Sequence, residues 1–439
     1  MTRVLLATLG SLGDLHPYIA LGKALRERGQ HVRLATSVDY RARVEAAGLD
    51  FTPLAPSIAE LGDPEQIARR FFGRWSGPER LIREMVMIPL RRACADLREA
   101  LDGVSLAVSH PITPALPIIA DSRGIPWISS VLAPSSLFSR SDPSVIPGLE
   151  WLQHLPGSGS LTQGVMLRWV RSLVRRLEQP LHALRAELGL PPCREALLMK
   201  GQFSALGTLA LFDSPLAERQ SDWPTDTCVC GAALHDAGDP EVPTASDDGL
   251  ERFLAAGAPP VVFALGSSAV WLARDYWQHA IAACNALGIR GLLLTGMPLQ
   301  QPLPANICAL NYVPYSRVFS HAAAIVHQSG IGTLSSALRS GRPQLLTPAG
   351  FDQPDNAARA VRLGVGRILP FRRAHDEARL VRELRALLAD RAYAKASGEV
   401  ADRLRGVDGA AAAAHRIIDL MDQKDSTRKC PTSTEASHG

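Results

Sequence analysis

The sequence lacks long apolar runs. No stretch approaches the roughly 18 apolar residues that a helix needs to cross a bilayer. The apolar run near the N-terminus spans only Val4 to Ala7 before polar residues and glycines follow, so it is too short for the core of a secretory signal. We therefore expect a cytoplasmic protein that is at most peripheral to a membrane.

Cysteines and net charge are low as well. Seven cysteines are scattered through 439 residues, without a C-x-x-C pair or a Cys/His array at zinc spacing, and an odd, scattered set is typical of reduced thiols. The formal net charge is only +4 and the basic residues are spread along the chain. This distribution gives no reason to expect a nucleic-acid partner.

The chain is too long for one ordinary hydrophobic core, and two domains of about 200 residues are the default. An alternation of apolar strands and amphipathic helices starts at Val4 and starts again at Val261, after a polar, acidic stretch. Strands that alternate with helices form parallel sheets. We predict a first domain over residues 1–235, a linker over 236–248, a second domain over 249–405, a C-terminal helix over 406–422 and a disordered tail over 423–439.

A glycine-containing turn joins the first strand, Val4 to Thr8, to a helix that we expect to start at Pro17, since proline suits the first helical turn. A turn in this place can bind a dinucleotide. Here it carries Gly10, Gly13 and Asp14 without a third glycine in register, and a carboxylate in the turn would repel a pyrophosphate. The first turn therefore indicates a site for something other than phosphate.

The stretch from His327 to Asn356 has the layout of an anion site. A short apolar run ends at His327, and Ser329, Gly330 and Gly332 follow before a helix-compatible segment. The N–H groups of such a loop can approach a phosphate closely, and a helix N-terminus favours negative charge.

The next strand, Gln344 to Leu346, is followed by a polar cluster with Asp352 and Gln353. Because the carboxyl ends of parallel strands line one crevice, where open α/β folds bind ligands, we expect this cluster and the anion loop to share a ligand. Asp355 is interpreted as an N-terminal cap of the helix that follows.

Three motifs carry a resemblance to a known family: G-S-x-G-D-x-x-P over residues 10–17, H-x-x-G-x-G-T over 327–333 and P-x-x-x-D-Q-x-x-N over 348–356. Together they resemble the inverting, metal-independent glycosyltransferases of the UDP-glycosyltransferase family (GT1), and the likeness covers about residues 3 to 420. The sequence looks most similar to the bacterial branch with the rhamnosyltransferase of rhamnolipid synthesis, sterol glucosyltransferases and glycopeptide-antibiotic glycosyltransferases. The resemblance implies an α/β protein of the GT-B fold, with two facing Rossmann-like domains, parallel sheets and a cleft between the domains.

The resemblance also implies roles for individual residues. It makes Asp14 the general base that takes a proton from an acceptor hydroxyl, with His16 and His110 on the acceptor side. For the donor it implies contacts from His327, Gly330, Gly332, Thr333 and Ser267 to the diphosphate, from Tyr312 and Val313 to the nucleotide base, and from Asp352 and Gln353 to the sugar hydroxyls. The implied donor is a UDP- or dTDP-hexose and the implied acceptor a hydroxyl of a hydrophobic small molecule or lipid, with no metal ion and no bound cofactor.

Two positions depart from the family pattern. Ser329 stands where bacterial relatives have a glycine, and Tyr312 stands where the family usually has a tryptophan, although a tyrosine can also stack on a base. Structural roles remain open for Asp14, as a capping acid at a helix N-terminus, and for His327, as a core histidine. Two other functions remain open too: a sugar-nucleotide epimerase on the same fold, and a non-catalytic partner of another glycosyltransferase.

Overall fold

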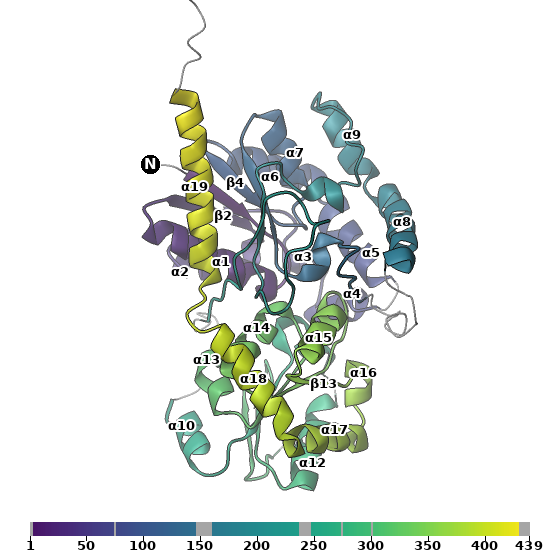
Figure 1. Ribbon diagram of the computed structural model, residues 1–439, viewed down its shortest axis with the longest axis vertical. Coiled ribbons are helices and arrows are strands. Elements are labelled where there is room, and N and C mark those ends of the chain that lie inside the picture. The colour runs from purple at the N-terminus through teal and green to yellow at the C-terminus, as the bar shows by residue number, and fades with distance from the viewer. Residues whose placement is uncertain are drawn as a thin grey trace, which may run out of the picture.

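The computed structural model describes residues 3–73, 76–145, 160–236, 247–273, 275–299 and 302–429. Two sheets built entirely from parallel strand pairs form two domains, and Figure 1 shows the first domain above the second. The predicted pair of Rossmann-like domains with parallel sheets is confirmed.

The first sheet has seven strands in the order β3-β2-β1-β4-β5-β6-β7. They are β1 Arg3–Ala7, β2 His31–Thr36, β3 Asp50–Pro53, β4 Leu106–Ser109, β5 Trp127–Val131, β6 Thr208–Ala210 and β7 Thr227–Val229. In β1, Val4 and Leu6 enter the core cluster on one face, and Leu5 and Ala7 enter the cluster on the other. A strand with helices on both faces has to be apolar throughout, which explains this sequence.

The helices of the first domain are α1 Leu12–Glu27, α2 Arg41–Ala46, α3 Ile58–Leu61, α4 Pro64–Phe71, α5 Gly77–Leu81, α6 Leu90–Ala100, α7 Ala115–Ser122, α8 Ser160–Leu177 and α9 Gln179–Glu187. A π-helix at Ile82–Met87 joins α5 to α6, and short 3-10 helices lie at Val38–Tyr40, Pro134–Leu137 and Lys200–Gln202.

The second sheet has six strands in the order β10-β9-β8-β11-β12-β13. They are β8 Val261–Ala264, β9 Gly291–Leu294, β10 Ile307–Leu310, β11 Ala324–His327, β12 Gln344–Leu346 and β13 Gly366–Ile368. The helices are α10 Asp247–Ala255, α11 Gly266–Ala269, α12 Tyr276–Leu287, α13 Tyr315–Val318, α14 Ile331–Ser340, α15 Gln353–Arg362, α16 Phe371–Ala374, α17 Glu377–Ala389, α18 Arg391–Arg403 and α19 Gly409–Lys429, with 3-10 helices at Val270–Leu272 and Phe319–His321. No helix in the described part of the chain is long and apolar enough to cross a membrane.

Both sheets reverse their winding direction beside their first strand, because β1 lies between β2 and β4, and β8 lies between β9 and β11. Ligands of open α/β sheets bind at such switch points, outside the carboxyl ends of the strands. The segments that leave β1 and β4 carry Asp14 and His110, and those at the ends of β8 and β11 carry Ser267 and His327. The topology therefore brings the predicted site residues to the two places where a ligand is expected.

The first helix differs from the prediction, which started it at Pro17. α1 begins at Leu12 because Ser11 caps it: the Ser11 hydroxyl accepts from the Gly13 N–H, and Asp14 completes a capping box. Pro17 consequently lies inside the helix.

The long helix α19 returns from the second domain to the first. Its residues Ala410, Ala413 and Ile417 join the core cluster around α1, and Figure 1 shows α19 running along the first domain. The helix continues to Lys429, past the predicted limit at 422. The rest of the predicted tail, 430–439, and most of the predicted linker, 237–246, lie outside the described residues.

The segment 213–217, between β6 and β7, anchors the first domain to the second. Both carboxylate oxygens of the buried Asp213 accept hydrogen bonds from Arg339 on α14, at 2.5 and 2.8 Å. Leu216 is 3% exposed and packs in a core cluster of the second domain that includes Leu334. An ion pair and an apolar contact, three residues apart in this segment, thus join the two domains.

We predict that Leu216→Ala lowers the free energy of unfolding by about 2–4 kcal/mol, because it leaves a cavity where the domains meet. Urea denaturation followed by circular dichroism measures the change. Leu173→Ala is the matched control, since Leu173 is 41% exposed, and it should stay within about 0.5 kcal/mol of the wild type. Equal losses in the two variants would contradict the anchoring role of Leu216.

Candidate active site

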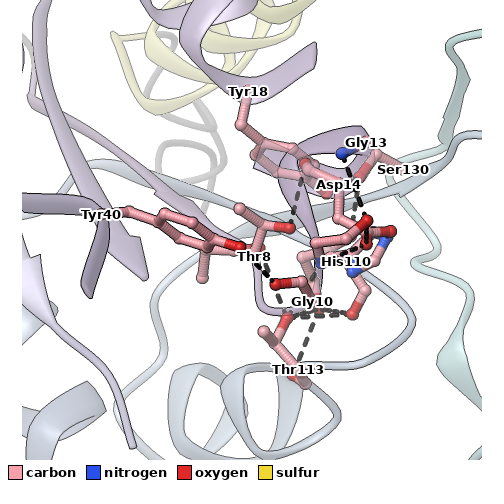
Figure 2. A network of polar contacts seen from close by, with 12 residues as sticks. Thr8, Gly10, Gly13, Asp14, Tyr18, Tyr40, His110, Thr113 and Ser130 are labelled. Atoms are coloured by element: carbon pink, nitrogen blue, oxygen red, sulfur yellow. Dashed lines mark hydrogen bonds and ion pairs between the residues drawn. The ribbon is translucent and has the colours of Figure 1, made fainter. Parts of the chain in front are cut away.

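Asp14 uses one carboxylate oxygen for the local structure and leaves the other free to act. Its Oδ2 accepts from the Ser11 N–H at 2.8 Å and from the Ser11 hydroxyl at 3.1 Å. Its Oδ1 lies 3.8 Å from Nε2 of His110, which comes from the loop after β4. Figure 2 shows the Asp14 carboxylate and the His110 ring side by side. Asp14 therefore has the capping role that the sequence left open, and only Oδ2 takes part in it.

Gly10 makes room for this carboxylate. Its φ is +121°, in the region that favours glycine, and a Cβ at this position would lie 2.3 Å from Asp14 Oδ2. Two further bonds fix the turn: the Tyr40 hydroxyl donates to the Gly10 carbonyl at 3.0 Å, and the Thr8 hydroxyl donates to the Asp14 carbonyl at 3.3 Å. The first glycine of the motif is thus explained by the position of Asp14.

The surroundings of Asp14 raise its affinity for a proton. Burial raises the pKa of Asp14 to about 6, against the hydrogen bonds from Ser11, which lower it. The side chain keeps 30% of its surface exposed, so a substrate can reach it. A carboxylate with this pKa is mostly ionised at pH 7 and is a better proton acceptor than an ordinary aspartate.

His110 is buried and neutral. Burial lowers its pKa to about 3, and its Nδ1 finds no hydrogen-bond partner among the described residues. Thr113 accepts from the His110 N–H at 3.1 Å and holds the loop. The ring lies edge-on to Tyr18, whose hydroxyl is 2.5 Å from that of Ser130. The imidazole beside Asp14 is therefore held by its neighbours as an uncharged group.

His16 lies in a different environment. Its ring meets the ring of His235 edge-on, with 5.5 Å between the ring centroids. His235 follows β7 and leads into the connection between the domains. Of the two histidines predicted on the acceptor side, His110 lies 3.8 Å from Asp14.

His327 is fully buried at the end of β11, and both ring nitrogens are engaged inside the protein. Nδ1 accepts from the Ser329 N–H at 3.1 Å, which leaves Nε2 to donate to the Gln344 side-chain oxygen at 3.0 Å. Burial lowers the pKa of His327 to about 4, so the ring is neutral. In this arrangement the ring holds the loop in shape, as a core histidine does.

The loop after β11 opens α14 without a side-chain cap. Gly330 is the N-cap residue, and a Cβ on Gly332 would meet nothing within 4 Å. Thr333 is buried beside Tyr315. The open helix N-terminus presents its first N–H groups to the outside, which is the arrangement that binds phosphate.

Ser329 occupies a glycine-type conformation in this loop. Its φ is +68°, and its buried hydroxyl has no partner within the part of the chain that the structure describes. A left-handed conformation costs a residue with a Cβ roughly 1–2 kcal/mol. The Asn356 side chain, which donates to the Ser329 carbonyl at 3.0 Å, helps to hold this conformation.

The neighbouring loop after β8 packs directly on this one. Gly266 has a φ of +67°, and a Cβ there would lie 2.0 Å from Nε2 of Gln328. Ser267 follows it and is exposed. Beyond β10, Tyr312 is half-buried, while the Val313 side chain packs in the core.

Asp352 and Gln353 begin α15. Asp352 Oδ2 accepts from the Asn356 side chain at 2.6 Å. Burial raises the pKa of Asp352 to about 7, the bond from Asn356 lowers it, and the negative charge of Asp14 raises it further. The side-chain oxygen of Gln353 accepts from the N–H groups of Ala349 and Gly350, at 2.9 and 3.3 Å. The carboxylates of two domains therefore lie within each other's electric field.

Sequence reasoning missed two contributors, Asn356 and Tyr18, and gave a third, Asp355, the wrong role. Asn356 ties Asp352 to the Ser329 loop, and the P-x-x-x-D-Q-x-x-N motif contains it without revealing that role. Tyr18 adjoins the first motif but shows no pattern of its own. Asp355 was expected to cap α15; instead it is buried and pairs with Arg359. Within the described ranges, no group of three or more His, Cys, Asp or Glu side chains is placed to hold a metal ion.

Two family models match the chain. Residues 4–94 match the glycosyltransferase family 28 N-terminal domain, and residues 294–419 match the C-terminal domain of erythromycin biosynthesis protein CIII-like proteins. Whole-length relatives agree. O-mycaminosyltylonolide 6-deoxyallosyltransferase of Streptomyces fradiae is 31% identical over 93% of this chain and 96% of its own length. Vancomycin aglycone glucosyltransferase of Amycolatopsis orientalis is 30% identical over 97% and 99%.

Solved structures share the architecture. The calicheamicin glycosyltransferase CalG4 superposes with a TM-score of 0.68 at 17% identity, covering 96% of this chain and 99% of CalG4. Glycosyltransferase VinC, solved in complex with dTDP, gives 0.67 at 18% identity, covering 96% and 100%. At these identities the likeness establishes the fold alone.

We predict that Gly10→Ala displaces the Asp14 carboxylate, because the new Cβ collides with Oδ2 as well as straining the backbone. Gly29→Ala is the matched control: Gly29 also has a positive φ, +77°, but a Cβ there meets nothing within 4 Å. Both variants should lose roughly 1–2 kcal/mol of stability from backbone strain, and Gly10→Ala should lose more.

Thermal unfolding and a glycosyl-transfer assay measure the two effects. The rate of transfer should fall at least tenfold in Gly10→Ala, since displacing a reacting group by about 1 Å can cost about 10²-fold. In Gly29→Ala the rate should stay within twofold of the wild type. Equal transfer in the two variants would show that the position of Asp14 does not matter.

Proposed function

The chain belongs to the GT1-type glycosyltransferases of the GT-B fold. From this premise we propose that it moves a hexose, with inversion, from a UDP- or dTDP-sugar to a hydroxyl of a hydrophobic small molecule or lipid. We assign Asp14 as the general base of this reaction. The observation that carries the proposal is that the negative charge of Asp14 raises the pKa of Asp352, which requires the two carboxylates to lie near each other. This proximity supports a site in which a proton acceptor of the first domain works beside the donor side of the second.

The donor diphosphate binds at the N-terminus of α14 in this proposal. The N–H groups of Ile331, Gly332 and Thr333 and the helix dipole stabilise the negative charge that develops on the leaving nucleoside diphosphate. Gly330 lets the phosphate approach, and Ser267 adds a hydroxyl from the adjoining loop. His327 contributes indirectly, because its two hydrogen bonds hold the loop in shape.

The sugar and the base complete the donor site. Asp352 accepts hydrogen bonds from the hexose hydroxyls, and Gln353 donates from its amide nitrogen, which makes no hydrogen bond within the described part of the chain. The nucleotide base stacks on the Tyr312 ring and lies against the backbone of Val313. VinC was solved with dTDP, which supports a thymidine nucleotide as one candidate.

The chemistry then needs one proton transfer. Asp14 Oδ1 takes the proton from the acceptor hydroxyl as that oxygen attacks the anomeric carbon, and the bond from this carbon to the diphosphate oxygen breaks on the opposite face. The configuration at the anomeric carbon inverts. Neutral His110, 3.8 Å from Oδ1, borders the place of the acceptor hydroxyl without competing for its proton. The leaving group is stabilised by the protein, and the proposed mechanism requires no divalent metal ion.

The acceptor class is proposed from the whole-length relatives. The two whole-length relatives are named for a tylonolide and for the vancomycin aglycone. These names support a natural-product acceptor.

We predict that Asp14→Asn keeps donor binding and lowers transfer by about 10²–10⁴-fold, because the amide cannot accept the proton. A thermal-shift screen with a panel of UDP- and dTDP-hexoses identifies the donor, since a ligand that binds the folded state raises its melting temperature. Transfer to a panel of hydrophobic aglycones is then followed with EDTA present throughout.

The outcomes separate the alternatives. Unchanged transfer by Asp14→Asn would remove the assigned base. Conversion of a nucleotide sugar in the absence of any acceptor would indicate an epimerase. Absence of binding across the donor panel would favour a non-catalytic partner protein.

A further inference from the structure

Arg359 is a fully buried cation that the reaction described above does not use. Its side chain is 1% exposed and lies on α15, the helix that begins with Gln353. The guanidinium donates to Asp355 Oδ2 at 2.7 Å, to the Leu216 carbonyl at 3.1 Å and to the carboxylate of Asp142. Two of these three partners, Asp142 and Leu216, belong to the first domain. A buried charge requires such partners, because leaving it unpaired is costly.

Asp355 extends the same network to the backbone of the first domain. Its second oxygen, Oδ1, accepts from the Val145 N–H at 2.9 Å. Arg362, also on α15, lies 3.8 Å from Asp142. The helix therefore holds the segment 139–145, named here the bridging segment, at two points: the Asp142 side chain and the Val145 backbone.

The opposite end of the bridging segment is fixed within the first domain. Asp222 accepts from the Ser139 hydroxyl at 2.8 Å and from the Arg140 N–H at 2.6 Å. The Ser139 hydroxyl accepts in turn from the Asp142 N–H at 3.0 Å. The bridging segment is thus held between Asp222 on one side and α15 on the other.

The helix α15 carries two functions on neighbouring turns. Its first residues, Asp352 and Gln353, face the proposed donor sugar, and Asp355 and Arg359 hold the bridging segment. A helix turns about every 3.6 residues, so Arg359 is two turns from the N-cap. Asn356 bonds both Asp352 and the Ser329 carbonyl, which links the start of the helix to the proposed phosphate loop. A shift of α15 on donor binding would therefore reach the bridging segment through side chains that are already in contact.

We propose that Arg359 is a positioning residue through which an occupied donor-sugar site fixes the bridging segment on the acceptor side of the first domain. The proposal rests on the proposed function, since it takes Asp352 and Gln353 as the donor-sugar contacts. It predicts a thermodynamic coupling between two sites on different domains, and such couplings are reciprocal.

Amide hydrogen exchange of the full-length protein tests the coupling, with UDP-glucose and dTDP-glucose as probes. Whichever probe binds should slow exchange in peptides that cover 329–333, where the diphosphate lies. It should also slow exchange in the bridging segment by about fivefold or more, the lower end of typical allosteric couplings. This readout requires no knowledge of the acceptor.

Asp142→Asn isolates the side-chain link. Asp142 is 23% exposed, so its replacement by the isosteric amide is tolerated better than a change at the buried Arg359. We expect the slowing at 329–333 to persist and the slowing in the bridging segment to fall below twofold. Asp142→Glu keeps the charge. It should restore at least half of the wild-type slowing of exchange in the bridging segment, compared as logarithms of the exchange rates. Arg123→Lys is the control, because it weakens an ion pair with Asp102 inside the first domain and should leave both effects unchanged.

The outcomes are distinct. Slower exchange at 329–333 without any change in the bridging segment would overturn the inference and leave the proposed function intact. The same would follow if Asp142→Asn lowered the melting temperature but still transmitted the full effect, since Arg359 would then have a structural role alone. If neither these two probes nor any other nucleotide sugar slowed exchange at 329–333, the proposed function would fail and the inference with it.

Discussion

The site depends on buried ion pairs that join the two domains. Asp213 of the first domain is fully buried and is neutralised by Arg339 of the second, and Arg359 of the second domain is neutralised in part by Asp142 of the first. A shift of one domain against the other would break these ion pairs and leave buried charges unpaired, which is costly. The relative placement of the domains is therefore specific. That placement sets the position of Asp14 against Asp352, and with it the geometry of a site that neither domain forms alone.

The site also shows a conflict between stability and function. Asp14 and Asp352 both have raised pKa values, about 6 and about 7, chiefly from burial. A carboxylate with a higher pKa in the folded state than in the unfolded state binds more protons when folded. The two groups therefore reduce stability progressively as the pH rises from about 4 to above 7. The left-handed Ser329 adds local strain in the same region. Such features are expected where a cleft is kept ready for a charged ligand.

The sequence was sufficient for what depends on local pattern, and insufficient for what depends on distant partners. Continuous apolar runs predicted strands such as Val4 to Thr8 and Gln344 to Leu346, whereas β3, with the sequence DFTP, carries no such run. The motifs placed Asp14, Gly330 and Asp352 after strand ends. The start of α1 was missed because Pro17 was weighed above the capping box of Ser11 and Asp14. The internal bonds of His327 depend on Gln344, which lies on the neighbouring strand. Arg359 and Asp142 are 217 residues apart in sequence, and no local pattern joins them.

The central claim is that Asp14 and Asp352 belong to one site formed by two domains. A carbon-13 NMR titration of the Asp352 carboxyl group, in the wild type and in Asp14→Asn, tests it most directly. Removal of the Asp14 charge should lower the pKa of Asp352 below its value of about 7, because a nearby negative charge disfavours ionisation. An Asp352 pKa that is the same in both proteins would show that the two carboxylates do not share a site, and would contradict the account.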